Sequence, residues 1–113
     1  MNWLPISKDE IKWLGVDFDD TIAHNSGYPD FIPQPPIEGA VEALRVLDKK
    51  GYKIVIYTAR HWADYQNIEA YCRKYGIPAR RIICGKPLFK WIIDDKNIEF
   101  HGDWQEVLTK LGE

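Results

Sequence analysis

Short apolar runs alternate with stretches of helical periodicity along this chain of 113 residues, and the alternation limits the folds it can adopt. The β-branched run Ile54-Val55-Ile56 lies at the centre of one predicted strand, and the apolar run that ends before Asp17 is another. Strands that alternate with helices are typical of a parallel sheet covered on both faces. The predicted strands are residues 11–18, 52–57, 81–84 and 90–93, with 98–101 as a candidate fifth.

The helical stretches complete this prediction. Between residues 37 and 50, apolar side chains recur at helical spacing, and Gly51 is well placed to end the helix. A second helix is predicted over residues 61–75, and a third from an N-cap at Asp103 to about Leu111. The predicted fold class is therefore α/β, a three-layer Rossmann-like fold around a central, mainly parallel sheet of about five strands.

The length predicts a single domain over residues 1–113. Residues 22–36 contain Gly27 and four prolines, so this segment cannot form a regular helix and is interpreted as a flap-like loop. Large aromatic side chains are more often buried than exposed, so we expect Trp13, Trp91 and Trp104 in the core.

Charge and cysteine content argue against several classes of protein. A formal net charge of −2 argues against a general nucleic-acid binder, which is usually basic. Two cysteines, Cys72 and Cys84, are too few for a disulfide framework and are expected to be buried thiols. No apolar run approaches the length of a membrane span, and no signal-peptide pattern opens the chain. We therefore expect a protein of the reducing cytoplasm with no membrane partner.

Carboxylates follow two of the predicted strands directly. Asp17 and Asp19 come at the end of the first strand, and Asp94 and Asp95 follow residues 90–93. The carboxyl ends of parallel strands lie at one edge of the sheet, where open α/β sheets bind ligands. Carboxylates brought close together repel each other unless a cation or a proton intervenes, and Mg²⁺ is the usual divalent cation with oxygen ligands. The pattern therefore predicts that these side chains meet at a Mg²⁺ site.

Four stretches, in this order, resemble the motifs of the haloacid dehalogenase-like (HAD) superfamily. They are GVDFDDT, IVIYT, GKP and IIDD, at residues 15–21, 54–58, 85–87 and 92–95. Three of them lie at the ends of predicted strands, which makes the match more specific than the first motif alone. The resemblance extends from about Lys12 to Asp95 and implies a small, capless member of the phosphatase type.

The resemblance implies a division of labour among the acidic residues. Asp17 is at the nucleophile position and would form an aspartyl-phosphate, while Asp19 would protonate the leaving oxygen and then activate water. An aspartate at the position of Asp19 is typical of the phosphatases in this superfamily. Mg²⁺ would be bound by Asp17, the backbone carbonyl of Asp19 and Asp94, with Asp95 binding it through water or orienting Asp94 and Lys86. Asp20 is interpreted as a turn residue.

The same resemblance provides candidates for binding the phosphate. Thr58 would offer its hydroxyl and Lys86 a compact positive charge. Lys90 is the alternative to Lys86, but it begins a predicted strand, so Lys86 is preferred. Thr21 and Arg60 are further candidates for the phosphate or substrate. The alternatives are that Thr21 stabilises its own loop and that Arg60 belongs to an exposed helix start.

The gaps between these motifs, residues 22–36 and 59–85, are too short for a folded cap domain, so we expect an open site. An open site suits a large substrate or a homo-oligomer in which a neighbouring subunit supplies the lid. The predicted function is a Mg²⁺-dependent phosphomonoester hydrolase, a phosphatase that acts through an aspartyl-phosphate on a small phosphorylated metabolite. The alternatives are a polynucleotide end phosphatase and a catalytically silent phosphate- or metal-binding module.

Overall fold

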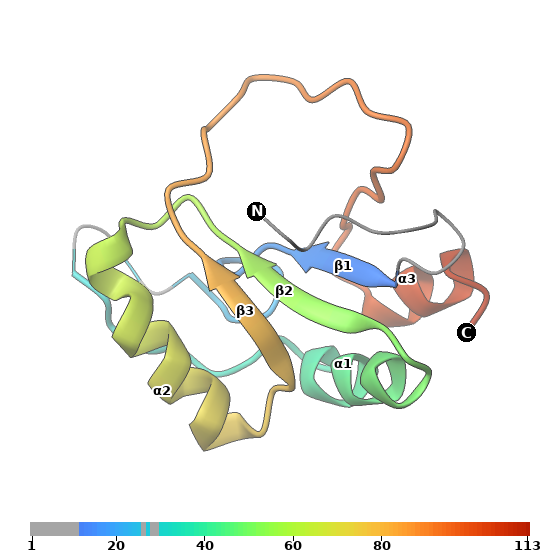
Figure 1. Ribbon diagram of the computed structural model, residues 1–113, viewed down its shortest axis with the longest axis horizontal. Coiled ribbons are helices and arrows are strands. Elements are labelled where there is room, and N and C mark those ends of the chain that lie inside the picture. Colours follow the sequence, from blue (N-terminus) through green and yellow to red (C-terminus); the bar gives the residue numbers. More distant parts are fainter. Residues whose placement is uncertain (1–11, 26, 28–29) are drawn as a thin grey trace.

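The computed structural model describes residues 12–25, 27 and 30–113 of the chain. Figure 1 shows the arrangement of its elements. In chain order they are strand β1 (Trp13–Val16), helix α1 (Ala40–Lys49), strand β2 (Lys53–Tyr57), the short 3₁₀ helix η2 (Trp62–Asp64), helix α2 (Tyr65–Tyr75), strand β3 (Ala79–Ile83) and helix α3 (Trp104–Lys110).

The described strands form one parallel sheet in the order β1-β2-β3. In register, Val16 of β1 lies opposite Ile56 of β2, and Ile56 lies opposite Ile82 of β3. Successive right-handed crossovers in one direction along a sheet bring their helices to the same face. Figure 1 accordingly shows α1 and α2 on one side of the sheet, and α3 contacts α1.

The expectation of a three-layer fold with about five strands is wrong, because the sheet of the described residues has three strands. Residues 90–93 and 98–101 are not strands; they belong to an irregular segment between β3 and α3, residues 84–103, that we call the long connection. In Figure 1 it arches away from the sheet in orange. An apolar run becomes a strand only when its backbone pairs with a neighbour and its side chains are covered.

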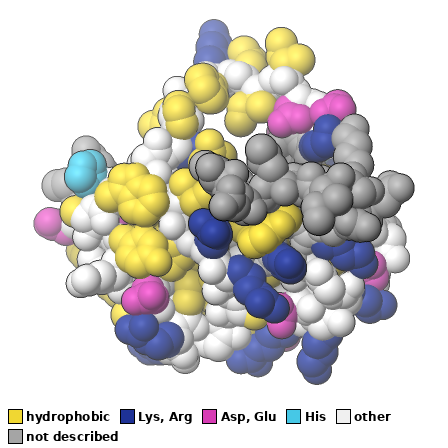
Figure 2. Space-filling view, viewed as in Figure 1, with side chains coloured by type: hydrophobic (Ala, Val, Ile, Leu, Met, Phe, Trp, Pro, Cys, Tyr) yellow, Lys and Arg dark blue, Asp and Glu magenta, His cyan; other side chains and the backbone are white. Residues whose placement is uncertain are grey.

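Neither condition is met along residues 88–93 of the long connection. The large apolar side chains there are exposed, and in Figure 2 hydrophobic side chains gather along the arch at the top of the view. They are Leu88, Phe89, Trp91, Ile92 and Ile93. The expectation that Trp91 lies in the core is therefore wrong, whereas Trp104 is buried as predicted and Trp13 is half-buried.

The core lies between the sheet and its helices. Ile54 and Ile56 of β2 are fully buried in one cluster with Leu44 and Leu47, which line the inner face of α1. Truncating any one of them to alanine is expected to cost about 2–5 kcal/mol. Cys72 of α2 joins this cluster as a free thiol, as predicted, and burial raises its pKa to about 12.

Aromatic contacts fix the loop that follows the first acidic motif. The ring of Phe18 stacks on that of Phe31, 6.0 Å away, and meets Tyr71 of α2 edge-on at 5.1 Å. The Tyr71 hydroxyl donates a hydrogen bond of 2.6 Å to the carbonyl of Gln34. The second half of the predicted flap is thereby held against α2 and the motif loop.

Most helix boundaries follow the sequence signals. Asp103 caps α3, since its carboxylate accepts a 2.9 Å hydrogen bond from the amide of Gln105. Gly51 and Gly76 have φ angles of 96° and 68° where α1 and α2 end, a conformation that glycine adopts without strain. Ile11, the first residue of the predicted first strand, lies outside the described residues. Within the described part of the chain, no helix is long and apolar enough to cross a membrane.

Candidate functional site

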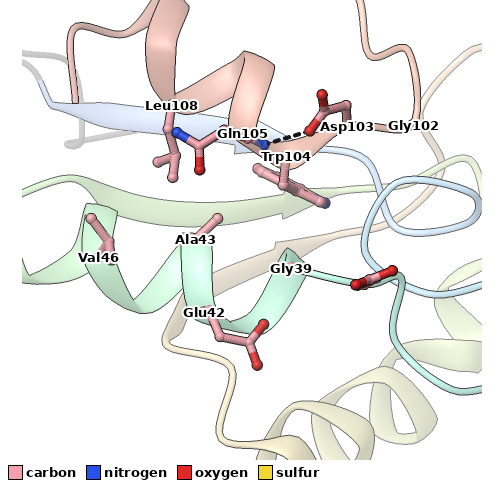
Figure 3. Close-up of a pocket in the computed structure, with 10 residues that line it drawn as sticks. Gly39, Glu42, Ala43, Val46, Gly102, Asp103, Trp104, Gln105 and Leu108 are labelled. Atoms are coloured by element: carbon pink, nitrogen blue, oxygen red, sulfur yellow. Dashed lines mark hydrogen bonds between the residues drawn. The ribbon is translucent and has the colours of Figure 1, made fainter.

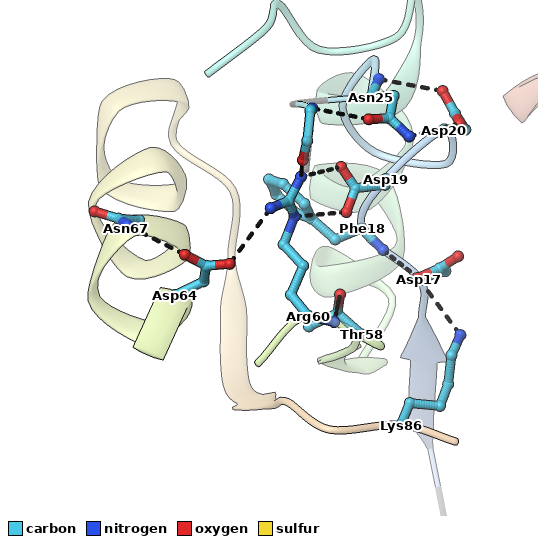
Figure 4. Close-up of polar contacts among 11 residues, drawn as sticks. Asp17, Phe18, Asp19, Asp20, Asn25, Thr58, Arg60, Asp64, Asn67 and Lys86 are labelled. Carbon is cyan, nitrogen blue, oxygen red and sulfur yellow. Dashed lines mark hydrogen bonds and ion pairs between the residues drawn. The ribbon is translucent and has the colours of Figure 1, made fainter. Parts of the chain in front are cut away.

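Asp17 lies immediately after the last residue of β1, at the carboxyl edge of the sheet (Figure 4). Its Oδ1 accepts a 2.8 Å hydrogen bond from the amide of Phe18 and lies 3.4 Å from Nζ of Lys86. The side chain is 43% exposed. No hydrogen bond or ion pair from the described residues engages Oδ2. Asp17 therefore offers solvent one oxygen, while the other is held in place.

Lys86 reaches Asp17 from the start of the long connection. Its amide donates to the carbonyl of Thr58 at 2.9 Å, and Gly85, with φ 77°, makes the turn before it. The Nζ atom also lies 5.4 Å from the centre of the Tyr57 ring, within reach of a cation–π interaction. The structure thus brings Lys86 to the acidic motif, as the resemblance implies, and gives Lys90 no described contact with Asp17.

Thr58 directly follows β2 and is 1% exposed. Its Oγ1 accepts a 3.1 Å hydrogen bond from the amide of Arg60, and its amide donates to the carbonyl of Ile83. The hydroxyl oxygen therefore holds the turn after β2. The predicted contact with a phosphate would use the hydroxyl proton as the donor.

The loop that carries the first motif closes on itself. The carbonyl of Phe18 accepts hydrogen bonds from the amides of Thr21, Ile22 and Ala23. Asp20 has φ 58°, and its carboxylate accepts a 3.1 Å hydrogen bond from the amide of Asn25, which confirms that it is a turn residue.

Thr21 is tied to α3 through its backbone. Its carbonyl accepts a 2.8 Å hydrogen bond from Nε1 of the buried Trp104. This contact involves no side-chain atom of Thr21, so its predicted contact with the phosphate or substrate stays a prediction. The contact does show that α3 holds the motif loop through the backbone carbonyl of Thr21.

Asp19 faces Arg60 rather than Lys86. Nε and Nη2 of Arg60 contact the two carboxylate oxygens of Asp19 at 2.7 and 3.0 Å, a bidentate pair. Figure 4 shows the carboxylates of Asp17 and Asp19 turned toward different cations. The expected general acid/base thus sits in a second ion pair beside that of the expected nucleophile.

The structure does not bring Asp94 and Asp95 to this edge. Asp94 accepts a 2.9 Å hydrogen bond from the amide of Lys96, and Asp95 pairs with Lys96 Nζ at 3.1 Å. The hydrogen bond from Lys96, helped by its charge, lowers the pKa of Asp95. Among the described residues, no group of three or more His, Cys, Asp or Glu side chains could hold a metal ion. The described structure therefore does not bring the predicted Mg²⁺ ligands together.

A separate hollow of about 480 Å³ lies between α1 and α3 (Figure 3). Glu42 and Val46 of α1 and Gln105 and Leu108 of α3 line it. None of the residues predicted for the site takes part, so this hollow and the carboxyl edge of the sheet are different places.

Sequence reasoning missed the partners of Arg60. Nη1 contacts Asp64 at 3.3 Å, Nη2 donates to the carbonyl of Gly27 at 2.8 Å, and the guanidinium lies 4.9 Å from the ring centre of Phe31. The spacing of four residues between Arg60 and Asp64 is a usable signal for such a pair. His61 is exposed and caps η2, since its Nδ1 accepts a 3.1 Å hydrogen bond from the amide of Ala63.

Comparisons with known proteins bear on the fold. No family model and no curated protein matches the chain. A crystal structure of a protein from Vibrio cholerae is similar, with a TM-score of 0.64 and 24% identity over 89% of this chain and 99% of that one. A conserved protein from Bacteroides thetaiotaomicron is similar with a TM-score of 0.65 and 23% identity over 91% of this chain and 93% of that one. The chain thus shares its fold with two bacterial proteins of comparable length.

Proposed function

We propose that this chain is a phosphomonoester hydrolase of the HAD-like type, a phosphatase that forms an aspartyl-phosphate on Asp17. The observation that carries the proposal is the 3.4 Å contact between Lys86 and Asp17 at the carboxyl edge of the parallel sheet. The two residues are far apart in the sequence, and the motif order implies their meeting. A nucleophilic carboxylate beside a lysine suits the transfer of an anionic phosphoryl group.

The two oxygens of Asp17 have different tasks in this proposal. Oδ1 is fixed by the amide of Phe18 and by Lys86, so Oδ2 is the oxygen that attacks phosphorus. Attack forms the Oδ2–P bond and breaks the bond from phosphorus to the leaving oxygen. Lys86 offsets the negative charge that Asp17 and the phosphoryl group bring together.

Asp19 handles the protons. It gives a proton to the leaving oxygen in the first step and takes one from water in the second, so that the water oxygen attacks phosphorus and phosphate leaves. The carboxylate that returns is Asp17, and the proton on Asp19 is restored. Each cycle therefore consumes one phosphomonoester and one water and yields an alcohol and phosphate.

Mg²⁺ is part of the proposal because the resemblance implies it. When bound, it would neutralise phosphate oxygens during transfer. Asp17 would hold such an ion, whereas Asp94 lies in the long connection with Lys96 as its neighbour. Turnover measured with and without added Mg²⁺ tests this part of the proposal.

The proposed substrate is a small phosphorylated metabolite. A polynucleotide end is the second candidate, because an open edge without a cap could admit a strand terminus. A homo-oligomer that supplies a lid is compatible with either substrate. A silent phosphate-binding module is the third reading, and it keeps the same site without turnover.

The test is a turnover screen with an aryl phosphate, phosphorylated sugars, nucleotides and 5′- and 3′-phosphorylated oligonucleotides, with and without Mg²⁺. We expect release of phosphate from small substrates, and at least about 10³-fold less from Asp17→Asn. The matched control is Asp48→Asn, in the last turn of α1, where activity should be retained. Mass spectrometry of acid-quenched enzyme should find phosphate on the peptide that contains Asp17.

Other outcomes would decide between the readings. Turnover restricted to oligonucleotides would favour the end phosphatase. Binding of a phosphate mimic such as vanadate without any turnover would favour the silent module. An Asp17→Asn variant as active as the unsubstituted chain would refute the aspartyl-phosphate.

A further inference from the structure

The side chain of Arg60 contacts three separate parts of the chain. Nε and Nη2 hold both oxygens of Asp19, Nη2 also donates to the carbonyl of Gly27, and Nη1 contacts Asp64. Four of the five guanidinium N–H groups are used in this way by described residues. Figure 4 shows the guanidinium between the motif loop and the start of α2.

This arrangement speaks against Arg60 as a phosphate ligand. Its side chain is only 7% exposed, and the ring of Phe31 lies 4.9 Å from the guanidinium carbon. A phosphate that bound it through two N–H groups would have to displace Asp19, Gly27 or Asp64. The contacts fit a structural role, in which Arg60 holds other residues of the protein rather than the substrate.

The backbone of Arg60 is held as firmly as its side chain. Its amide donates to Oγ1 of Thr58 at 3.1 Å, and its carbonyl accepts from the amide of Gly85 at 2.8 Å. Burial opposes the charge of the guanidinium, but the hydrogen bond and charge of Asp19, followed by those of Asp64, raise the pKa of Arg60. The cation is therefore permanent and fixed relative to the segment that carries Lys86.

We infer that Arg60 is a positioning residue: its fork sets the orientation of the Asp19 carboxylate and ties it to the flap at the carbonyl of Gly27. This inference rests on the proposed function, in which Asp19 transfers protons. Proton transfer needs the carboxylate within hydrogen-bond reach of the reacting oxygen, and a displacement of about 1 Å can cost about 10²-fold in rate. Arg60 thus acts on the reaction through Asp19 and the flap.

The kinetic test compares Arg60→Lys with Arg73→Lys, an exposed arginine of α2 that pairs with Glu69 at 3.2 Å. Lysine keeps the charge but lacks the planar fork. For Arg60→Lys we expect kcat to fall about 10–100-fold while KM and the inhibition constant of inorganic phosphate stay within about 3-fold. Arg73→Lys should leave all three unchanged. A rise in KM and in the phosphate inhibition constant with kcat retained would overturn the inference and make Arg60 a substrate ligand.

A second measurement needs no activity and separates this inference from the proposed function. Hydrogen exchange is followed on peptides that cover residues 19–25 and 30–36, in Arg60→Gln and in Arg73→Gln. We expect faster exchange in both peptides for Arg60→Gln alone, because the tie between the motif loop and the flap is lost. If the unsubstituted chain hydrolyses no phosphomonoester, the proposed function fails and this exchange result alone decides the positioning role. Unchanged exchange in Arg60→Gln would overturn the inference.

Discussion

The carboxyl edge of the sheet and the long connection carry the same kinds of residue in different surroundings. At the edge, Asp17 meets a cation that a distant segment supplies, Lys86. In the long connection, Asp94 is satisfied by the amide of Lys96, two residues later. A contact between distant segments depends on the fold, whereas a contact between near neighbours can form in almost any loop. The comparison separates acidic residues whose partners are distant in the sequence from acidic residues whose partners are near neighbours.

Apolar residues show the same difference. Ile56 in β2 is 0% exposed and pairs on both sides, while Ile93 in the long connection is 100% exposed. Both belong to short apolar runs that contain two isoleucines, residues 54–56 and 91–93. The surroundings of a run, not its composition, decide whether it becomes part of a sheet.

The largest expected effect is on turnover, and it compares Asp17 with Asp94. Asp17→Asn should lose at least about 10³-fold in phosphatase activity, because the nucleophile is gone. Asp94→Asn should lose less than about 10-fold, because the structure keeps this carboxylate with Lys96. Steady-state kinetics with one aryl phosphate measures both. An equal loss in the two variants would show that the long connection moves onto the sheet edge when the enzyme works.

The next effect is on stability, and it compares the two isoleucines. Ile56→Ala should lower the free energy of unfolding by about 2–4 kcal/mol, since it leaves a cavity in a packed core. Ile93→Ala should change it by less than about 0.5 kcal/mol, as for other exposed positions. Urea denaturation followed by circular dichroism measures both. A loss above about 1 kcal/mol for Ile93→Ala would mean that this side chain is covered in solution.

A smaller effect is expected for two tryptophans. Trp104→Phe removes the hydrogen bond to the carbonyl of Thr21 and should cost about 1–2 kcal/mol. Trp91→Phe should be nearly neutral, because Trp91 is mostly exposed. The same denaturation experiment applies, and acrylamide quenching of the fluorescence should drop most in Trp91→Phe. If quenching drops more in Trp104→Phe, the assignment of buried and exposed rings is reversed.

The smallest effect concerns His101, where the long connection joins α3. Its ring lies 2.7 Å from Glu106 and 3.2 Å from Glu99, and these hydrogen bonds, that of Glu106 first, raise the pKa of His101. Because the pKa of His101 is higher in the folded state, the protonated ring stabilises the folded protein fully below its ordinary pKa of 6.5. This stabilisation is lost as the pH rises through the raised pKa. The hydrogen bond from His101 also lowers the pKa of Glu106 from its ordinary 4.5, so that contribution is present above this pH.

The measurement is the difference in unfolding free energy between the unsubstituted chain and His101→Gln, as a function of pH. It should be largest between about pH 4.5 and 6.5 and shrink on the alkaline side. High salt should reduce it, because the pair is exposed to solvent. A difference that grows from pH 6 to pH 8 would contradict this ion pair.

Much of the fold could be predicted from the sequence. The three strands of the sheet and the three α-helices all lie at or close to their predicted positions, because β-branched runs, helical periodicity and caps such as Asp103 are local signals. The candidate site was predictable where a motif lies at the end of such a strand, as with Asp17 and Thr58. Lys86 was predictable from its motif order, and the structure brings it to Asp17.

The rest needed information that no local pattern contains. Residues 90–93 have the composition of a strand, but a strand also requires a partner edge and a covering layer. The position of Arg60, two residues after Thr58, made it a candidate phosphate ligand. In the structure its guanidinium instead binds Asp19, and Gly27 and Phe31 contact it from another part of the chain. Such approaches are decided by packing between distant segments.

The sequence by itself determined the order of the elements and the placing of Asp17 at the end of a strand, because both depend on residues near one another in the chain. It also predicted the pairing of an acidic motif with a later lysine, because that depends on motif order. Only the tertiary structure decided which acids have distant partners, that Arg60 holds Asp19, and that the long connection lies apart from the sheet. The physical reason is that burial and pairing depend on two segments that pack together, whereas a local sequence pattern describes only one of them.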